Sequence, residues 1–359
     1  MRFLLLVGLT FGFAQAAEPG ITLRVGASRA DITPEPTVLN WVTGKPYGEV
    51  LEKIYVHAVV LDDGTTRAAL LRWDLVDVSE SARDEVRKVV GAALNMPGGN
   101  IFVHASHNHS APWAPVYQGG DRGKERDTWW AIRHMPAQNE FPPFKRWMER
   151  LLAASVEAAK AAADSAVPAS MSIGRIAAPE LLYNRRPRMP RWGIEGKVPA
   201  AVGYAHKDWN PEVAQGGASF GPMDRTLSLV SFRNGENKPL ATLFHLACHA
   251  VSIYPSTPAI NADWPGPASR ALSDAHGGGE SIFLQGCAGE ITPAYRGVKA
   301  VADMAVVVAK KSQIALQYGV KLKAEPIRVA RTTIQLSLTP EAKVRLGAET
   351  VAAEVQAIV

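Results

Sequence analysis

Two pairs of histidines stand at the ends of predicted strands, where their imidazoles could bind a metal ion. His107 and His109 follow an apolar run over 100–106, and residues two apart on an extended chain project to the same face. His245 and His249 end a second apolar run, and strand or helical geometry would place both on one face. Imidazole is the commonest metal ligand, so each strand end is a candidate half of a metal site.

The same histidines are also compatible with purely structural roles. His104 falls on the opposite face of its strand from His107, and we expect it to be structural. His245 fits a core histidine that bonds a backbone carbonyl, whereas His249 stands where the strand should end and is the better ligand candidate. An isolated His-x-His pair is a weak metal signal, so both interpretations stay open.

Two other segments carry residues that could take part in chemistry. Asp263 precedes Trp264-Pro265-Gly266, where a carboxylate is either a helix N-cap or a functional group. Residues 285–293 end a strand in the small-residue loop Gly-Cys-Ala-Gly, whose N–H groups could face an oxyanion. A plain turn accounts for that loop equally well.

The elements that position these residues follow from the spacing of apolar residues. Strands are predicted over residues 21–27, 54–61, 67–73, 100–106, 170–176, 226–232, 239–247, 281–284 and 327–336. Helices are predicted over residues 79–95, 144–163, 268–275, 298–316 and 340–359. Strands and helices intermix without strict βαβ order, so we predict an α/β fold in the loose sense (mixed α+β), with mixed β-sheets flanked by helices.

The N-terminus resembles a secretory signal peptide. Met1-Arg2 precedes an apolar run over 3–13 and the small-x-small site Ala14-Gln15-Ala16. The run is too short to span a bilayer, although an uncleaved anchor remains the alternative. We expect cleavage after Ala16, a secreted or periplasmic protein, and one catalytic domain over residues 17–359.

Composition excludes several classes of protein. Hydrophobic residues make up 47% and charged residues 20% of the 359 residues, which is a globular balance rather than a disordered, collagen-like or coiled-coil one. The net charge is +5, and no Lys/Arg block indicates nucleic-acid binding. The basic balance is compatible with weak peripheral contact with anionic lipid headgroups.

Six motifs occur in a fixed order along the chain. They cover residues 25–33 (VGASRADIT), 105–112 (ASHNHSAP), 184–187 (NRRP), 249–252 (HAVS), 263–266 (DWPG) and 289–293 (GEITP). Together they resemble the neutral, non-lysosomal ceramidase family, and the similarity extends from about residue 23 to about residue 296. One motif alone would be weak evidence, but six in order are fairly specific.

The resemblance implies a zinc-dependent amidase that hydrolyses the N-acyl bond of ceramide, a lipid substrate, through a zinc-activated water. It implies Zn²⁺ ligation by His107 and His249, catalytic roles for His109, Glu290 and Thr292, and substrate contacts from Arg185, Asp263 and Gly289. Trp113, Trp129 and Trp130 in the long loop 107–143 either form an apolar wall for an acyl chain or anchor the loop.

The sequence departs from the family in several places. Thr292 stands where the family has Ser, Glu290 where it has Asp, and Cys287 where Asn is usual. The family takes its remaining zinc ligands, a Glu and a Tyr, from sequence further downstream, so we expect the catalytic domain to be incomplete at its C-terminus. Two alternatives therefore stay open: a related hydrolase of another amide or ester, and a non-catalytic lipid- or glycan-binding relative.

The two cysteines, Cys248 and Cys287, flank the site motifs. An oxidising compartment would permit a disulfide between them, but the sequence does not show whether they lie close enough to bond.

Overall fold

The computed structural model describes residues 21–117, 141–180, 182–185, 223–254 and 257–358. Nine strands form one sheet: β1 (Arg24–Asp31), β2 (Tyr55–Asp62), β3 (Arg67–Trp73), β4 (Ile101–Ala105), β5 (Val167–Ala177), β7 (Thr226–Asn234), β8 (Pro239–Leu246), β9 (Glu280–Gln285) and β11 (Val320–Leu322). The α-helices are α1 (Glu80–Leu94), α3 (Pro142–Asp164), α5 (Pro265–His276), α6 (Val298–Gln317) and α7 (Pro340–Leu346), and η1 (Gly98–Asn100) is a 3₁₀ turn. The predicted fold class, mixed α+β with helices flanking a mixed sheet, is confirmed.

The sheet consists of two halves joined by a short seam. Its strand order is β4-β3-β2-β1-β5-β7-β8-β9, with β11 beside β5. Neighbouring strands are antiparallel except β3–β4 and β8–β9, which are parallel. β1 pairs along its full length with β2, but it meets β5 through two residue pairs, Arg24 with Pro168 and Val25 with Val167. We call β1–β4 the first half and β5, β7, β8, β9 and β11 the second half.

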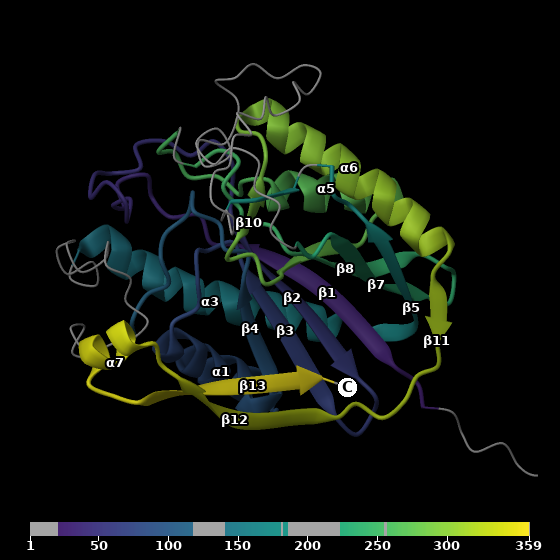
Figure 1. Ribbon diagram of the computed structural model, residues 1–359. Helices are drawn as coiled ribbons and strands as arrows, with labels where there is room; N and C mark the ends of the chain where they lie inside the picture. The colour runs from purple at the N-terminus through teal and green to yellow at the C-terminus, as the bar shows by residue number, and fades with distance from the viewer. Residues whose placement is uncertain (1–20, 118–140, 181, 186–222, 255–256, 359) are drawn as a thin grey trace, which may run out of the picture.

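The two halves fold over each other and enclose an apolar layer. Val25 and Val59 from the first half pack with Phe232, Ala241 and Ile282 from the second. Helices α1 and α3 cover the outer face of the first half, and α5 and α6 cover the outer face of the second (Figure 1). The layers are therefore helix, sheet, sheet and helix. None of the described helices is long and apolar enough to cross a membrane.

Local signals explain why α1 forms where the sequence predicts it. The Ser79 hydroxyl accepts a 3.1 Å hydrogen bond from the N–H of Ala82 and so caps the first turn. Asn95, with a φ of 48°, takes the left-handed conformation that ends the helix. Val86 and Val90, four residues apart, are buried on the face that packs against the core.

The close packing of α3 on β1 depends on Gly26. A Cβ atom at this position would lie 1.9 Å from the carbonyl oxygen of Ala162. We expect Gly26→Ala to lower the free energy of unfolding by about 2 kcal/mol, because an overpacked site must displace backbone. Urea unfolding followed by circular dichroism measures the loss. Gly235→Ala is the matched control, since nothing lies within 4 Å of its Cβ position, and an equal loss in both variants would contradict the prediction.

Several polar side chains cross the apolar layer between the two halves. Arg72 is fully buried there. His57 Nδ1 lies 3.3 Å from Glu280 Oε2 on the opposite half. His104 Nε2 accepts a 2.7 Å hydrogen bond from the N–H of Gln285, which ties β4 to β9. The predicted structural role of His104 is thereby confirmed.

Burial makes stability depend on pH through these two histidines. Desolvation, followed by the positive charge of Arg72, lowers the pKa of His57 and of His104 to about 4. An unfolded histidine titrates near pH 6.5, so between about pH 6.5 and pH 4 the unfolded chain binds more protons than the folded chain. The free energy of unfolding should therefore fall as the pH decreases through this window. Urea unfolding at a series of pH values checks this, and His104→Gln should make the fall shallower; a constant stability would refute it.

The predicted helix over 340–359 is wrong beyond its first turns. Helix α7 ends at Leu346, because Gly347 adopts a φ of 60° and caps it in the left-handed conformation. Residues Thr350–Ile358 form strand β13, which pairs antiparallel with β12 (Val329–Ser337). Burial along β13 largely alternates, a period of two that is also present in its Val and Ala residues. The same residues also fit the helical period of 3.6, and the pairing with β12 selects the strand.

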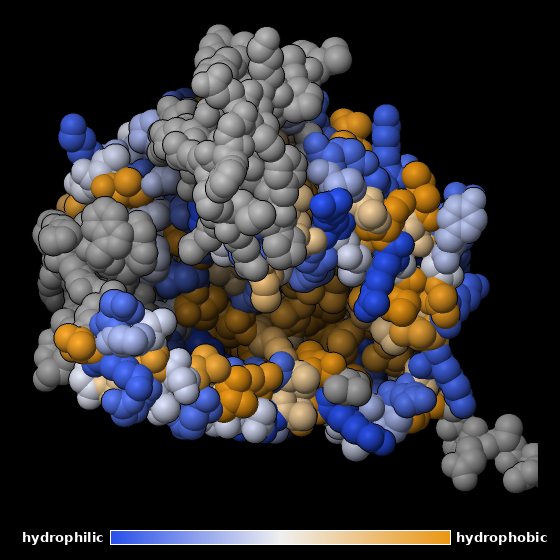
Figure 2. All heavy atoms as spheres, viewed as in Figure 1, coloured by the Kyte–Doolittle hydropathy of each residue, from blue (hydrophilic) through white to orange (hydrophobic). Residues whose placement is uncertain are grey.

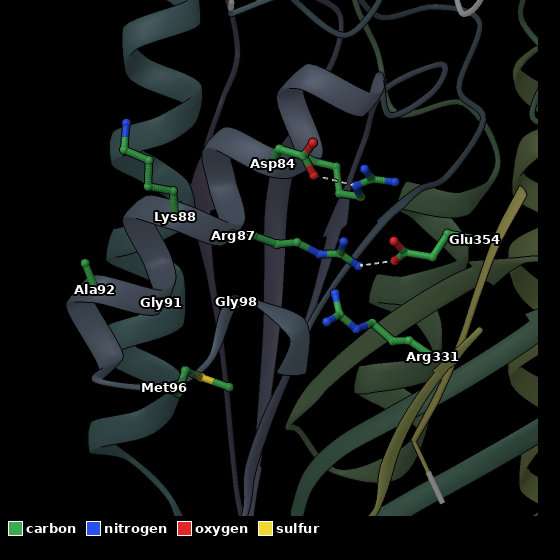
Figure 3. Close-up of a pocket in the computed structure, with 10 residues that line it drawn as sticks. Asp84, Arg87, Lys88, Gly91, Ala92, Met96, Gly98, Arg331 and Glu354 are labelled. Carbon is green, nitrogen blue, oxygen red and sulfur yellow. Dashed lines mark hydrogen bonds and ion pairs between the residues drawn. The ribbon is translucent and has the colours of Figure 1, made fainter. Parts of the chain in front are cut away.

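The β12–β13 hairpin packs against α1 and the edge of the inter-sheet layer. The Arg87 guanidinium of α1 donates to Glu354 of β13 at 3.1 Å, with Arg331 of β12 beside the pair (Figure 3). Val329 and Ile358 pack against the apolar cluster between the halves. Figure 2 shows a hollow lined with apolar atoms directly above the hairpin. The hairpin thus covers part of one edge of this layer.

Candidate metal centre

The loop after β4 carries His107 and His109 and is held by backbone hydrogen bonds. The N–H of Asn108 donates to Leu75 at 3.0 Å, and the N–H of His109 donates to Ala250 at 3.3 Å. The Asn108 side chain is fully buried, so the two imidazoles flank a residue that points into the protein. His107 has a φ of 58°, a left-handed conformation and not the extended one that the sequence predicted. The two rings nevertheless reach the same place.

His249 approaches the same point from the loop after β8. Its N–H donates to the carbonyl of Ile291 at 3.0 Å, and its own carbonyl accepts a 2.9 Å bond from the indole Nε1 of Trp264. The structure therefore brings together the predicted His107, His109 and His249. His245 remains on β8, where its ring packs against Gly286.

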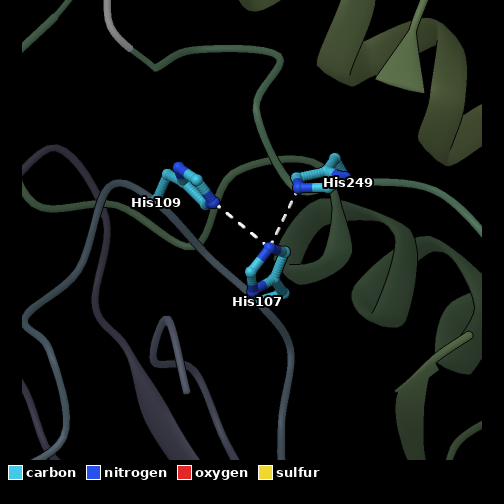
Figure 4. Close-up of side chains that lie close together, drawn as sticks. All are labelled: His107, His109 and His249. Carbon is cyan, nitrogen blue, oxygen red and sulfur yellow. Dashed lines mark hydrogen bonds between the residues drawn. The ribbon is translucent and has the colours of Figure 1, made fainter. Parts of the chain in front are cut away.

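The three imidazoles converge through ring nitrogens (Figure 4). His107 Nε2 lies 3.0 Å from His249 Nε2 and 3.3 Å from His109 Nε2. One ring nitrogen from each residue lies within 4.8 Å of the others. Among the described residues this is the cluster that could hold a metal ion.

Hydrogen bonds at Nδ1, the ring nitrogen that points away from the cluster, distinguish two of these histidines from the third. His107 Nδ1 lies 2.8 Å from the carbonyl of Val76, and His249 Nδ1 bonds the carbonyl of Ala288. A carbonyl only accepts, so each Nδ1 carries the proton and each Nε2 turns a lone pair inward. His109 Nδ1 is buried without a hydrogen-bond partner among the described residues.

These bonds test whether the site fits a metal ion. Two Nε2 lone pairs 3.0 Å apart repel each other unless a cation or a proton lies between them. A carbonyl that accepts from the far ring nitrogen is typical of histidines that ligate metals. His107 and His249 therefore have the chemistry of ligands for zinc or a similar borderline cation. His109, whose Nδ1 has no such carbonyl among the described residues, fits the role of a ligand less well.

The electrostatics of the cluster disfavour a proton as the bridge. Burial is the main cause that lowers the pKa of His107, and burial lowers the pKa of His249 to about 4. Burial and the two neighbouring rings hold the pKa of His109 well below its usual value. All three rings are therefore neutral at pH 7, which is the form that binds a metal.

The predicted Arg185 lies next to this cluster. Strand β6 (Leu182–Asn184) pairs with β10 (Ile291–Pro293) and carries Arg185 to the small-residue loop. The Arg185 guanidinium donates to the carbonyl of Gly289 from Nε at 3.2 Å and from Nη2 at 3.1 Å. Its Nη2 also lies 3.4 Å from His249 Nε2. Arg185 thus places a positive charge at the cluster.

The small-residue loop supports the cluster through carbonyls, a contact that the sequence did not predict. The carbonyl of Ala288 anchors His249, and that of Glu290 accepts the N–H of Arg185 at 2.8 Å. Gly289 is exposed. Thr292 is fully buried on β10, where it pairs with Tyr183. No sequence signal identifies a backbone carbonyl that accepts such a hydrogen bond, since every residue type has a carbonyl.

Comparison with known proteins places the fold. No family model matches the chain, and no curated protein matches it by sequence. The neutral ceramidase from Pseudomonas aeruginosa matches with a TM-score of 0.64 and 15% sequence identity, over 89% of this chain and 48% of that one. The chain has the fold of a neutral ceramidase. A ceramidase complexed with C2 matches at the same score and identity, over 89% of this chain and 47% of its own. The chain therefore spans about half the length of these structures.

Within this ceramidase fold, Asp263 holds the loop that follows His249. Its carboxylate is fully buried and accepts from the N–H groups of Ser252 at 2.8 Å, Ile253 at 2.9 Å and Trp264 at 2.8 Å. Burial raises the pKa of this carboxyl, and the backbone N–H groups oppose the rise. The substrate contact of Asp263 stays a prediction, and these bonds give the residue a structural role.

Aromatic side chains surround His109 in the ceramidase fold. The rings of Trp41 and Tyr254 lie 5.4 and 5.1 Å from the His109 ring, centroid to centroid. Trp113 packs edge-on against Trp41 at 5.2 Å, which extends the group. The sequence singled out Trp113 but missed Trp41 and Tyr254, because both come from distant segments. The predicted Trp129 and Trp130 lie outside the described residues, as does the signal peptide.

The disulfide that the sequence left open does not form. Cys248 is buried and Cys287 is exposed, and both are free thiols. Burial raises the pKa of the Cys248 thiol well above its usual value, which disfavours the reactive thiolate.

Proposed function

We propose that this chain is a secreted or periplasmic, zinc-dependent amidohydrolase that cleaves the N-acyl bond of ceramide or a related N-acyl lipid. One observation carries the proposal: in a ceramidase fold, His107 and His249 turn two Nε2 lone pairs toward each other, with both Nδ1 atoms bonded to carbonyls. The TM-score of 0.64 supports the fold, and at 15% identity the likeness carries no further than that, so substrate and chemistry are proposals.

His107 and His249 would hold the zinc ion, and His109 adjoins them. A bound zinc ion supplies Lewis-acid chemistry, since it polarises a carbonyl and activates water at neutral pH. The protein orients the two rings through the carbonyls of Val76 and Ala288. Neutral imidazoles need no deprotonation before they bind the ion.

Arg185 and His109 are the residues placed to act on the amide. Attack on the amide builds negative charge on its oxygen, and the Arg185 guanidinium beside the cluster can donate to it, a contribution of about 3 kcal/mol for one such donor. The leaving amine needs a proton. His109, neutral at pH 7, can accept a proton from the attacking water at Nε2 and deliver that proton to the leaving amine.

The proposal includes catalytic roles for Glu290 and Thr292 and a substrate contact for Gly289. The Gly289 carbonyl already binds Arg185, so this glycine fixes the guanidinium. The Thr292 hydroxyl would assist at the scissile amide. Thr292 lies on β10, which pairs with β6, the strand that ends just before Arg185.

A ceramide-like lipid is the proposed substrate, and the membrane surface is where the protein would meet it. The sequence pI is about 9.1, which favours peripheral contact with anionic headgroups. The predicted signal peptide supports export to that location.

The test uses the full chain loaded with zinc and a fluorescent ceramide. We expect release of the fatty acid, loss of activity after chelation and recovery when zinc is restored. His107→Ala should abolish the activity, whereas His276→Ala, outside the cluster, should retain it. Full activity in the chelated protein would overturn the proposal.

A second candidate is a related hydrolase that acts on another amide or an ester. The burial of Thr292, where the ceramidase family has serine, favours it, since the added methyl changes the space beside the site. A panel of N-acyl and ester substrates separates the two. Lipid binding without turnover, retained in His107→Ala and His249→Ala, would point to a non-catalytic relative.

A further inference from the structure

A polar pocket lies at the opposite end of β7 and β8 from the histidine cluster. It has a volume of about 420 Å³ and is bounded by the β7–β8 turn, the C-terminal ends of α5 and α6, and β11. In Figure 1, α6 runs away from β10 and ends beside β11, at the edge of the molecule. Its polar lining includes Ser172, Ser231, Arg233, His276, Gln313 and Lys321.

The sheet beneath the pocket carries polar side chains where an apolar face would be expected. Lys321 pairs with Ser172, Ser172 with Ser231, and Ser231 with Thr242, so four adjacent strands present polar residues at one level. Leu229, two residues before Ser231 and therefore on the same face, packs in the apolar core under α5 and α6. The polar row interrupts this core and contributes no apolar packing of its own.

Two buried polar atoms in the pocket have no hydrogen-bond partner among the described residues. They are the hydroxyl of Ser231, a residue that is 1% exposed, and Nε2 of His276. His276 Nδ1 lies 3.5 Å from the Thr242 hydroxyl, which can donate to it and leave the proton on Nε2. Buried polar groups are rarely left unsatisfied, so both atoms indicate a missing polar partner.

The charges around the pocket define that partner. Arg233 and Lys321 contribute two positive charges, and no carboxylate belongs to the part of the lining that the structure describes. Burial first, and the charge of Arg233 second, lower the pKa of His276, so that it serves as a neutral donor. The lining therefore offers donors from Arg233, Lys321, Ser231 and His276.

Helix C-termini normally repel anions, but their carbonyls are occupied here. At the end of α5, the carbonyls of Ser273 and Asp274 accept N–H groups of the following glycines, and that of Ala275 accepts from the Gln313 amide at 3.0 Å. At the end of α6, the carbonyl of Leu316 accepts the N–H of Gly319. These bonds reduce the partial negative charge that faces the pocket.

We propose that this pocket binds a tetrahedral oxyanion, a phosphate or sulfate group that is either free or carried on a small organic molecule. Arg233 and Lys321 would neutralise its charge, and Ser231 and His276 would donate to its oxygens. The volume exceeds that of the bare ion, which leaves space for an organic group.

Isothermal titration of the full chain with inorganic phosphate tests the proposal, with sodium chloride at matched ionic strength as the blank. We expect saturable binding, and a shift of the His276 ring signals in NMR spectra on addition of phosphate. The double variant Arg233→Gln/Lys321→Met should bind at least about tenfold more weakly, because charge-assisted hydrogen bonds are lost. A parallel titration with glycerol phosphate tells whether a free ion or an organic phosphate binds more tightly.

Lys238→Met is the matched control. Lys238 is an exposed lysine on the same turn, paired with Glu236 at 2.8 Å, and it does not line the pocket. Its variant should bind phosphate as the parent protein does. Ser231→Ala, which keeps the backbone and removes one buried donor, should also weaken binding. Absence of saturable binding, or equal weakening in Lys238→Met and the double variant, would overturn the proposal without bearing on the zinc site.

Discussion

Replacing His249 with alanine is expected to lower the zinc affinity of this chain by more than about 100-fold. Loss of an outer hydrogen-bond partner already weakens metal sites by about 10–100-fold, and removal of the ligand itself should cost more. His249 contributes an inward Nε2 lone pair that the Ala288 carbonyl holds in place. His107→Ala should have an effect of similar size, because Val76 anchors His107 in the same way. Competition titration against a chromophoric zinc chelator measures these affinities.

The comparison within the cluster makes this experiment specific. His109→Ala should weaken zinc binding much less, because no described residue anchors its Nδ1. His276→Ala should leave zinc binding unchanged, since this ring lines the polar pocket at the far end of β7 and β8. Equal losses in His109→Ala and His249→Ala would contradict the assignment of His107 and His249 as the two principal ligands.

Asp263→Asn is expected to lower the free energy of unfolding by about 3 kcal/mol, although the two side chains have nearly the same shape. Asp263 Oδ1 accepts from Ser252 and Trp264, while Oδ2 accepts from Ile253. An amide has one oxygen, so asparagine must direct its NH₂ group against at least one backbone N–H in a fully buried site. Urea unfolding measures the loss.

The same substitution should also weaken zinc binding, by about tenfold. The loop that Asp263 holds connects to His249 through Trp264, whose indole donates to the His249 carbonyl at 2.9 Å. Asp274→Asn is the control, because Asp274 is an exposed aspartate on α5. A stability loss of the same size in Asp274→Asn would show that the buried hydrogen bonds are not the cause.

Local sequence signals predicted the parts of the fold that depend on neighbouring residues. The predicted strands 54–61 and 67–73 occur as β2 and β3, and those over 226–232 and 239–247 occur as β7 and β8, because alternation of apolar and polar residues acts over a few positions. Helix α1 follows from its cap and its apolar spacing. The helix prediction over 350–358 was wrong because the Val and Ala residues there fit both the helical period of 3.6 and the strand period of two. A distant partner strand, β12, decides between them.

The site was predictable as far as residue type and strand position reveal it. His107, His109 and His249 were found because histidines at strand ends are visible in a sequence, and the family motifs agreed. The left-handed backbone of His107 carries no such signal, since the residue is not a glycine. The Ala288 carbonyl, Trp41 and Tyr254 reach the cluster only through long-range packing, which periodicity does not encode.

The seam between β1 and β5 gives the metal site a thermodynamic consequence. His107 belongs to the first half of the sheet and His249 to the second, and 142 positions separate them in sequence. A shared ion would link two halves whose strands pair through only two residue pairs. Because the ion binds the assembled state, each tenfold rise in free zinc above the dissociation constant would add about 1.4 kcal/mol to the unfolding free energy. Zinc availability would therefore set how cooperatively the two halves unfold.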